Sequence, residues 1–119
     1  HWLDFLKIPA DSVDIMGFSQ GGAVALIYLL RHPDRIGRTA CLAGFLPQGG
    51  EDAAKPGSLA GKKVLVAHGS LDDTIPIHMA KHSAEYLQKA GAEVIFCQDA
   101  VGHKLGPTCY KGLEGFFAT

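Results

Sequence analysis

Four short apolar runs alternate with stretches of helical spacing along the 119-residue chain, and this alternation constrains the fold more than any other feature of the sequence. Strands that alternate with helical crossovers predict a parallel sheet with helices packed on its faces. We therefore expect a single α/β domain over residues 1–119, with about four parallel strands and flanking helices. The strands are expected at residues 13–18, 38–45, 63–67 and 93–97, and the helices at 23–31, 76–90 and 107–116.

The chain begins with His1 rather than Met, and residues 1–7 have the apolar spacing of a helix with no N-cap signal before them. We expect that further residues precede His1 in the parent gene. Residues 47–61 are rich in Gly, Pro and Ala and are expected to form a loop.

The composition is that of an ordinary water-soluble globular protein, with 47% apolar and 19% charged residues and a formal net charge of −1. No block of like charges points to nucleic acid or to an anionic membrane surface. The longest apolar run, residues 23–30, is too short to cross a bilayer, and no signal-peptide pattern opens the chain.

The three cysteines, Cys41, Cys97 and Cys109, are sparse and show no CxxC spacing. This usage predicts reduced thiols in a cytoplasmic protein rather than a disulfide framework or a metal site. Cys41 and Cys97 stand among apolar residues of expected strands, so we expect both to fill the core.

The first candidate for chemistry is Ser19, in the run Gly17-Phe18-Ser19-Gln20-Gly21 between an expected strand and an expected helix. A Gly-x-Ser-x-Gly run in this context is typical of a strained turn that projects a nucleophilic hydroxyl from the top of the sheet, and side chains at the flanking glycines would clash. The backbone N–H of Gln20 would then point at a developing oxyanion, helped by the field of the helix N-terminus.

A serine hydroxyl needs a base, which is itself oriented by an acid. The loop after the third strand supplies Asp72 and Asp73, between which the chemistry alone does not choose, and the loop after the fourth strand supplies His103. The resulting order Ser, Asp, His is the order that this kind of sheet uses. All three positions follow parallel strands, whose carboxyl ends gather functional groups.

The other histidines predict no site. His78 and His82 have the i, i+4 spacing of metal ligands, but the glutamate of an H-E-x-x-H motif is missing, so we expect no metal. His32 lies at a helix C-terminus, where it can interact with the last carbonyls. His68 is expected to support its own loop.

These residues make the chain similar to the phospholipase/carboxylesterase family of α/β-hydrolases, which includes acyl-protein thioesterases and bacterial carboxylesterases. The resemblance runs from about Phe5 to the end of the chain. Its marks are Ile15-Met16-Gly17-Phe18-Ser19-Gln20-Gly21-Gly22, Leu42-Ala43-Gly44-Phe45-Leu46-Pro47, His68-Gly69-x-x-Asp72-x-x-Ile75-Pro76 and Gly102-His103.

The resemblance implies that Ser19 is the nucleophile, Asp72 the acid, His103 the base and Gln20 a backbone donor of the oxyanion hole. Asp72 is preferred over Asp73 because it stands four residues after His68, as the family pattern requires. The resemblance further implies a serine hydrolase that acts on short to medium acyl esters, thioesters or lysophospholipids with neither metal nor organic cofactor.

Members of the family are about twice as long as this chain, so it resembles the C-terminal half of an α/β-hydrolase fold. The absent half would carry the first strands and the loop with the second oxyanion-hole N–H. We therefore expect an exposed edge on the first strand, and a homodimer or segment-swapped oligomer. The alternative is a catalytically incompetent fragment that acts as a structural or partner-binding half; a dienelactone hydrolase or perhydrolase activity is a third reading.

Overall fold

The computed structural model describes residues 13–47 and 57–118, so the helix expected at residues 1–7 and most of the loop expected at 47–61 lie outside the described residues. The expected alternation of strands and helices is present throughout the described part. The elements in chain order are β1 (Val13–Phe18), α2 (Gln20–Arg31), a 3₁₀ turn (Pro33–Arg35), β2 (Ile36–Leu42), β3 (Lys63–Gly69), α3 (Ile77–Lys89), β4 (Glu93–Asp99) and α4 (Pro107–Ala118).

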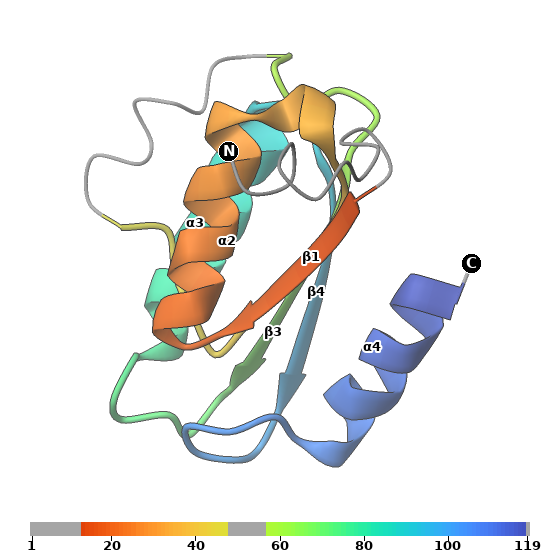
Figure 1. Ribbon diagram of the computed structural model, residues 1–119. Coiled ribbons are helices and arrows are strands. Elements are labelled where there is room, and N and C mark those ends of the chain that lie inside the picture. The colour runs from red at the N-terminus through yellow and green to blue at the C-terminus, as the bar shows by residue number, and fades with distance from the viewer. Residues whose placement is uncertain (1–12, 48–56, 119) are drawn as a thin grey trace.

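The four strands form one sheet in the order β1-β2-β3-β4, and every neighbouring pair is parallel. All four therefore end at the same edge of the sheet, and Figure 1 shows the arrowheads of β1, β3 and β4 there. The expected α/β fold with four parallel strands is confirmed. This edge is where the loops after β1, β3 and β4 begin.

The helices cover both faces of the sheet (Figure 1). Helices α2 and α3 pack on one face over a large buried cluster that includes Leu26, Leu29 and Leu87. Helix α4 packs on the other face, against β3 and β4, over a smaller cluster that includes Leu65 and Phe116. Within the part of the chain that the structure describes, no helix is long and apolar enough to cross a membrane.

Several element boundaries differ from the sequence prediction by one to three residues, and two of these differences have a clear local reason. Helix α2 begins at Gln20 rather than at residue 23, because the carbonyl of Ser19 already accepts the N–H groups of Gly22 and Ala23. Strand β2 ends at Leu42 rather than at residue 45, because Ala43 has a φ of 52° that turns the chain out of the sheet.

Strand β1 is the outermost strand of the described sheet on its side. Its side chains alternate between partly buried and exposed, and the exposed set includes Met16, 61% exposed, and Phe18, 45% exposed. Among the described residues, β1 therefore borders one side of the sheet and carries exposed apolar side chains.

The prediction of three reduced thiols is wrong, because Cys97 and Cys109 form a disulfide. Cys97 lies in β4 and Cys109 in the first turn of α4, and the packing of this helix on the sheet brings their Cα atoms to 5.8 Å. Their separation of 12 residues carries no spacing signal, which is why the sequence does not reveal the pair. Cys41 is free and fully buried, as expected of a core residue, and burial raises its pKa to about 12, despite an opposing hydrogen bond with the backbone of Gly44.

Titration of thiols in the unfolded, unreduced chain is expected to find Cys41 alone among the three cysteines. Because the disulfide joins β4 to α4, Cys109→Ser should lower the free energy of unfolding by roughly 2–4 kcal/mol. A reductant should lower it by a similar amount in the wild type and leave the variant unchanged. Three titratable thiols, or equal sensitivity of both proteins to reductant, would contradict the assignment.

Candidate active site

Ser19 sits on a strained turn between β1 and α2. Its φ of 57° and ψ of −118° lie in a region that non-glycine residues rarely adopt and that costs about 1–3 kcal/mol. The turn is held in place because the backbone N–H of Ser19 donates to the carbonyl of Leu42, at the end of the neighbouring strand, at 2.8 Å. The sequence therefore forms the projecting turn that its Gly-x-Ser-x-Gly run predicts.

The two glycines of that run do not have the same reason to be glycine. A methyl group on Gly17 would collide with the backbone of Gly21, as expected. A methyl group on Gly21 would meet nothing within 4 Å among the described residues, so the clash expected there is absent. The tight positions are instead Gly22, where an added Cβ would lie 3.0 Å from the Cys41 sulfur, and Gly44, where it would lie 2.8 Å from the carbonyl oxygen of Ser19.

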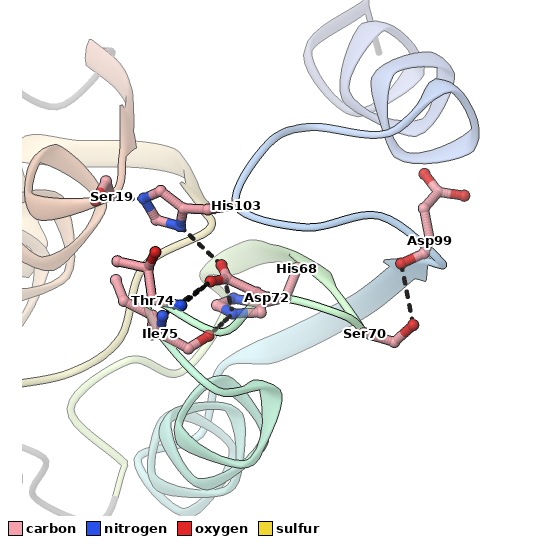
Figure 2. Close-up of polar contacts among 8 residues, drawn as sticks. All are labelled: Ser19, His68, Ser70, Asp72, Thr74, Ile75, Asp99 and His103. Atoms are coloured by element: carbon pink, nitrogen blue, oxygen red, sulfur yellow. Dashed lines mark hydrogen bonds and ion pairs between the residues drawn. The ribbon is translucent and has the colours of Figure 1, made fainter.

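Asp72 lies in the loop between β3 and α3, with a side chain that is fully buried. One carboxylate oxygen, Oδ1, accepts the backbone N–H groups of Thr74 at 2.9 Å and Ile75 at 2.8 Å. The other oxygen, Oδ2, lies 2.7 Å from Nδ1 of His103 (Figure 2). The loop thus holds this carboxylate with its free oxygen toward His103, while Asp73 is exposed.

The pKa of Asp72 lies below its ordinary value. Burial by itself raises this pKa, but the hydrogen bond from the Ile75 backbone and that from the His103 side chain outweigh burial. The Thr74 backbone and the charge of His103 act in the same direction. Asp72 is therefore held as a carboxylate, the form that can accept a hydrogen bond from an imidazole.

His103 lies in the loop between β4 and α4 and joins the carboxylate to the serine. Its Nε2 is 2.9 Å from Oγ of Ser19, and Figure 2 shows the ring between Ser19 and Asp72. If Nδ1 donates to Asp72, Nε2 is left to accept the hydroxyl proton of the serine. The ring of Phe18 packs beside that of His103, with 5.2 Å between centroids.

The loops that carry Asp72 and His103 are joined to each other through their backbones. The N–H of Ser70 donates to the carbonyl of Asp99 at 2.8 Å, and that of Leu71 to the carbonyl of Val101 at 3.0 Å. The loops approach so closely that a methyl group on Gly69 would collide with the carbonyls of Val101 and Gly102. These contacts fix the distance between the carboxylate and the imidazole.

Asp99, which no motif in the sequence marks, anchors the loop that carries His103. Its Oδ2 accepts the backbone N–H of Cys109 at 2.9 Å, in the first turn of α4. An oxygen acceptor at this position satisfies one of the N–H groups that a helix start leaves free. Together with the disulfide between Cys97 and Cys109, this bond closes the loop on both sides of His103.

Gln20 is the first residue of α2, so its backbone N–H has no acceptor within the helix. An N–H at a helix N-terminus, directly after the serine, can stabilise negative charge on an atom bonded to Oγ of Ser19. Among the described residues, the start of α2 thus places one backbone donor, the N–H of Gln20, beside the serine. The described residues form no group of three potential metal ligands, and His78 and His82 lie on the exposed side of α3.

A pocket of about 450 Å³ lies away from these residues, under α4. It is lined by Arg38 and Lys63 near the beginnings of β2 and β3, and by Phe116 of α4. None of Ser19, Asp72 and His103 lines this pocket, so it is separate from the serine and its two partners.

Comparison with known sequences gives one consistent result. A sequence profile of the phospholipase/carboxylesterase family matches residues 1–116. The chain is 30% identical over 111 residues to a probable carboxylesterase of Oryza sativa subsp. japonica, which covers 92% of the chain. It is 31% identical over 87 residues, 72% of the chain, to acyl-protein thioesterase 1 of Mycosarcoma maydis. A second rice protein, 35% identical over 99 residues, or 82% of the chain, is a probable inactive carboxylesterase.

Solved structures show the same fold. The Bacillus cereus carboxylesterase superposes with a TM-score of 0.82 at 19% identity, over 98% of this chain and 54% of its own. Arabidopsis thaliana SOBER1 superposes with the same TM-score at 25% identity, over 99% of this chain and 59% of its own. The chain spans less than half the length of the three curated relatives, since the matches cover 42%, 36% and 40% of theirs.

The lowered pKa of Asp72 predicts a pH dependence of stability. Its contribution is present above the unfolded pKa of about 3.9 and is lost as the pH falls through the lower folded pKa. Asp72→Asn should therefore lower the free energy of unfolding by roughly 1–3 kcal/mol at pH 7. The difference from the wild type should shrink below about pH 4, as urea denaturation at several pH values would show.

Asp73→Asn is the matched control, because this neighbouring carboxyl is exposed. It should change the free energy of unfolding by less than about 0.5 kcal/mol at every pH. If the two variants behave alike, Asp72 is not held as a carboxylate by the loop.

Proposed function

The chain belongs to the phospholipase/carboxylesterase family, and on that basis we propose that it hydrolyses short to medium acyl esters or thioesters through an acyl-enzyme on Ser19. The observation that carries the proposal is the continuous line of hydrogen bonds from Asp72 through His103 to Ser19. This arrangement lets an imidazole take and return the proton of a serine hydroxyl. The proposal needs neither a metal nor an organic cofactor.

In the first half of the proposed reaction, Oγ of Ser19 attacks the acyl carbon while Nε2 of His103 accepts the hydroxyl proton. The carboxylate of Asp72 orients the imidazole and stabilises the imidazolium that forms. The carbonyl oxygen becomes an oxyanion, to which the backbone N–H of Gln20 donates. Collapse of this intermediate breaks the bond to the alcohol or thiol, which leaves with the proton from His103.

In the second half, His103 takes a proton from water and the hydroxide equivalent attacks the acyl carbon on Ser19. The same oxyanion donor acts again, and His103 returns the proton to Oγ as the carboxylic acid leaves. Each residue thus ends in its initial state. The net reaction consumes one water for each ester or thioester bond that is broken.

The oxyanion hole needs a second donor, because losing one donor of such a site costs about 10²–10³ in rate. We propose that another copy of the chain supplies it, as a homodimer or a segment-swapped oligomer. Support comes from β1, which is the outermost strand of the described sheet and exposes Met16 and Phe18. An exposed strand edge and an apolar surface favour association.

A second candidate function is a catalytically incompetent fragment that acts as a structural or partner-binding half. One observation favours it: the rice relative that is 35% identical over 99 residues is a probable inactive carboxylesterase. This alternative keeps Ser19 and His103 in place but predicts no turnover.

The cysteine usage predicts a cytoplasmic location, and we propose that location for this chain. The disulfide between Cys97 and Cys109 weighs against it, since cytosolic thiols are kept reduced. In a reducing compartment we expect both cysteines to be thiols.

Hydrolysis of p-nitrophenyl acetate and butyrate by the purified chain tests the two functions. The wild type should hydrolyse both esters, and Ser19→Ala should reduce the rate to the buffer background because the nucleophile is removed. Ser58→Ala is the matched control, since its buried hydroxyl has no hydrogen-bond partner among the described residues, and it should retain the wild-type rate. Equal background rates in wild type and Ser19→Ala would favour the incompetent fragment.

A further inference from the structure

One buried polar side chain next to the candidate site has no part in the reaction proposed above. His68 is in β3, directly before the loop that carries Asp72, and its side chain is fully buried. Figure 2 shows its ring behind the carboxylate of Asp72, on the side away from Ser19. It therefore contacts the acid but neither the serine nor the base.

The contacts of His68 determine which ring nitrogen carries the hydrogen. Nε2 lies 2.6 Å from the carbonyl oxygen of Ile75, which can only accept, so Nε2 carries the hydrogen. The same Nε2 is 3.3 Å from Oδ2 of Asp72. Nδ1 is buried and has no hydrogen-bond partner among the described residues. A buried ring nitrogen without a partner costs less free energy as a bare acceptor than as an N–H donor, so this also places the hydrogen on Nε2.

This bond holds the peptide group that in turn holds the acid. The carbonyl of Ile75 accepts from His68, while the N–H of Ile75 donates to Oδ1 of Asp72. Ile75 is thus fixed from two sides, seven residues along the chain from His68. With Oδ1 held by the backbone, Oδ2 of Asp72 is left at 2.7 Å from His103.

We propose that His68 is a positioning residue, which closes the loop over residues 69–75 so that Asp72 is held against His103. The proposal rests on the proposed function only in giving that pair a catalytic purpose. His68 touches no substrate in this account and transfers no proton. It acts through Ile75, and more weakly through its own N–H beside Oδ2 of Asp72.

Two amide substitutions separate positioning from simple filling of space. The amide nitrogen of His68→Gln reaches about as far as Nε2 and can still donate to the carbonyl of Ile75. In His68→Asn the amide is polar but too short to make this bond. His78→Gln, at an exposed histidine of α3, is the surface control.

The first measurement is the pKa of the Asp72 carboxyl, determined by a pH titration that is monitored by ¹³C NMR. This measurement does not depend on turnover. His68→Asn should raise this pKa toward its ordinary value, because the loop N–H groups and His103 no longer hold the carboxylate. His68→Gln and His78→Gln should keep it low. The groups in contact with this carboxylate are His68, His103 and the N–H groups of Thr74 and Ile75.

The second measurement is kcat and KM for p-nitrophenyl butyrate. His68→Asn should lower kcat by about 10²-fold, as a misplacement of about 1 Å does, with KM nearly unchanged. An Asn variant that loses stability but keeps the low Asp72 pKa would overturn the proposal and leave His68 a packing residue, as would equal effects of Asn and Gln. If the wild type has no turnover, the proposed function fails, and the Asp72 pKa still decides the role of His68.

Discussion

The hydrogen bond between Oδ2 of Asp72 and Nδ1 of His103 is the interaction on which the arrangement of the site depends. It joins two residues that are 31 positions apart in the sequence. The imidazole of His103 then contacts Ser19, which is 84 positions away from it. The bond is possible because β1, β3 and β4 are parallel and end at one edge of the sheet. Two backbone hydrogen bonds join the loop of Asp72 to the loop of His103, and the close packing of Gly69 lets the two loops approach each other. Together these contacts set the distance between Asp72 and His103.

Two features of the site are energetically unfavourable, and the surrounding structure must offset their cost. Ser19 has a strained backbone, and Asp72 is a charged group without solvent exposure. The hydrogen bond from the N–H of Ser19 to the carbonyl of Leu42 holds the strained turn, and the backbone N–H groups of Thr74 and Ile75 stabilise the buried carboxylate. Each compensation lies within a few residues of the strand ends, so the sheet itself supports the site.

Much of this could be predicted from the sequence, because it depends on local patterns. The four strands follow from short apolar runs, and Ser19 follows from the glycine spacing around it. The chemistry alone could not choose between Asp72 and Asp73, whereas the structure buries the first and exposes the second. The disulfide between Cys97 and Cys109 and the bond from His68 to Ile75 depend on how elements pack, which no local pattern encodes.

We propose that the three loops of this chain together make the hydroxyl of Ser19 nucleophilic. The most direct test is treatment of the native chain with a fluorophosphonate, followed by peptide mapping by mass spectrometry, beside His103→Gln. We expect one adduct in the native chain, located on Ser19, and none in the variant, because the hydroxyl then has no base. A native chain that stays unlabelled, or equal labelling of both proteins, would contradict the proposal.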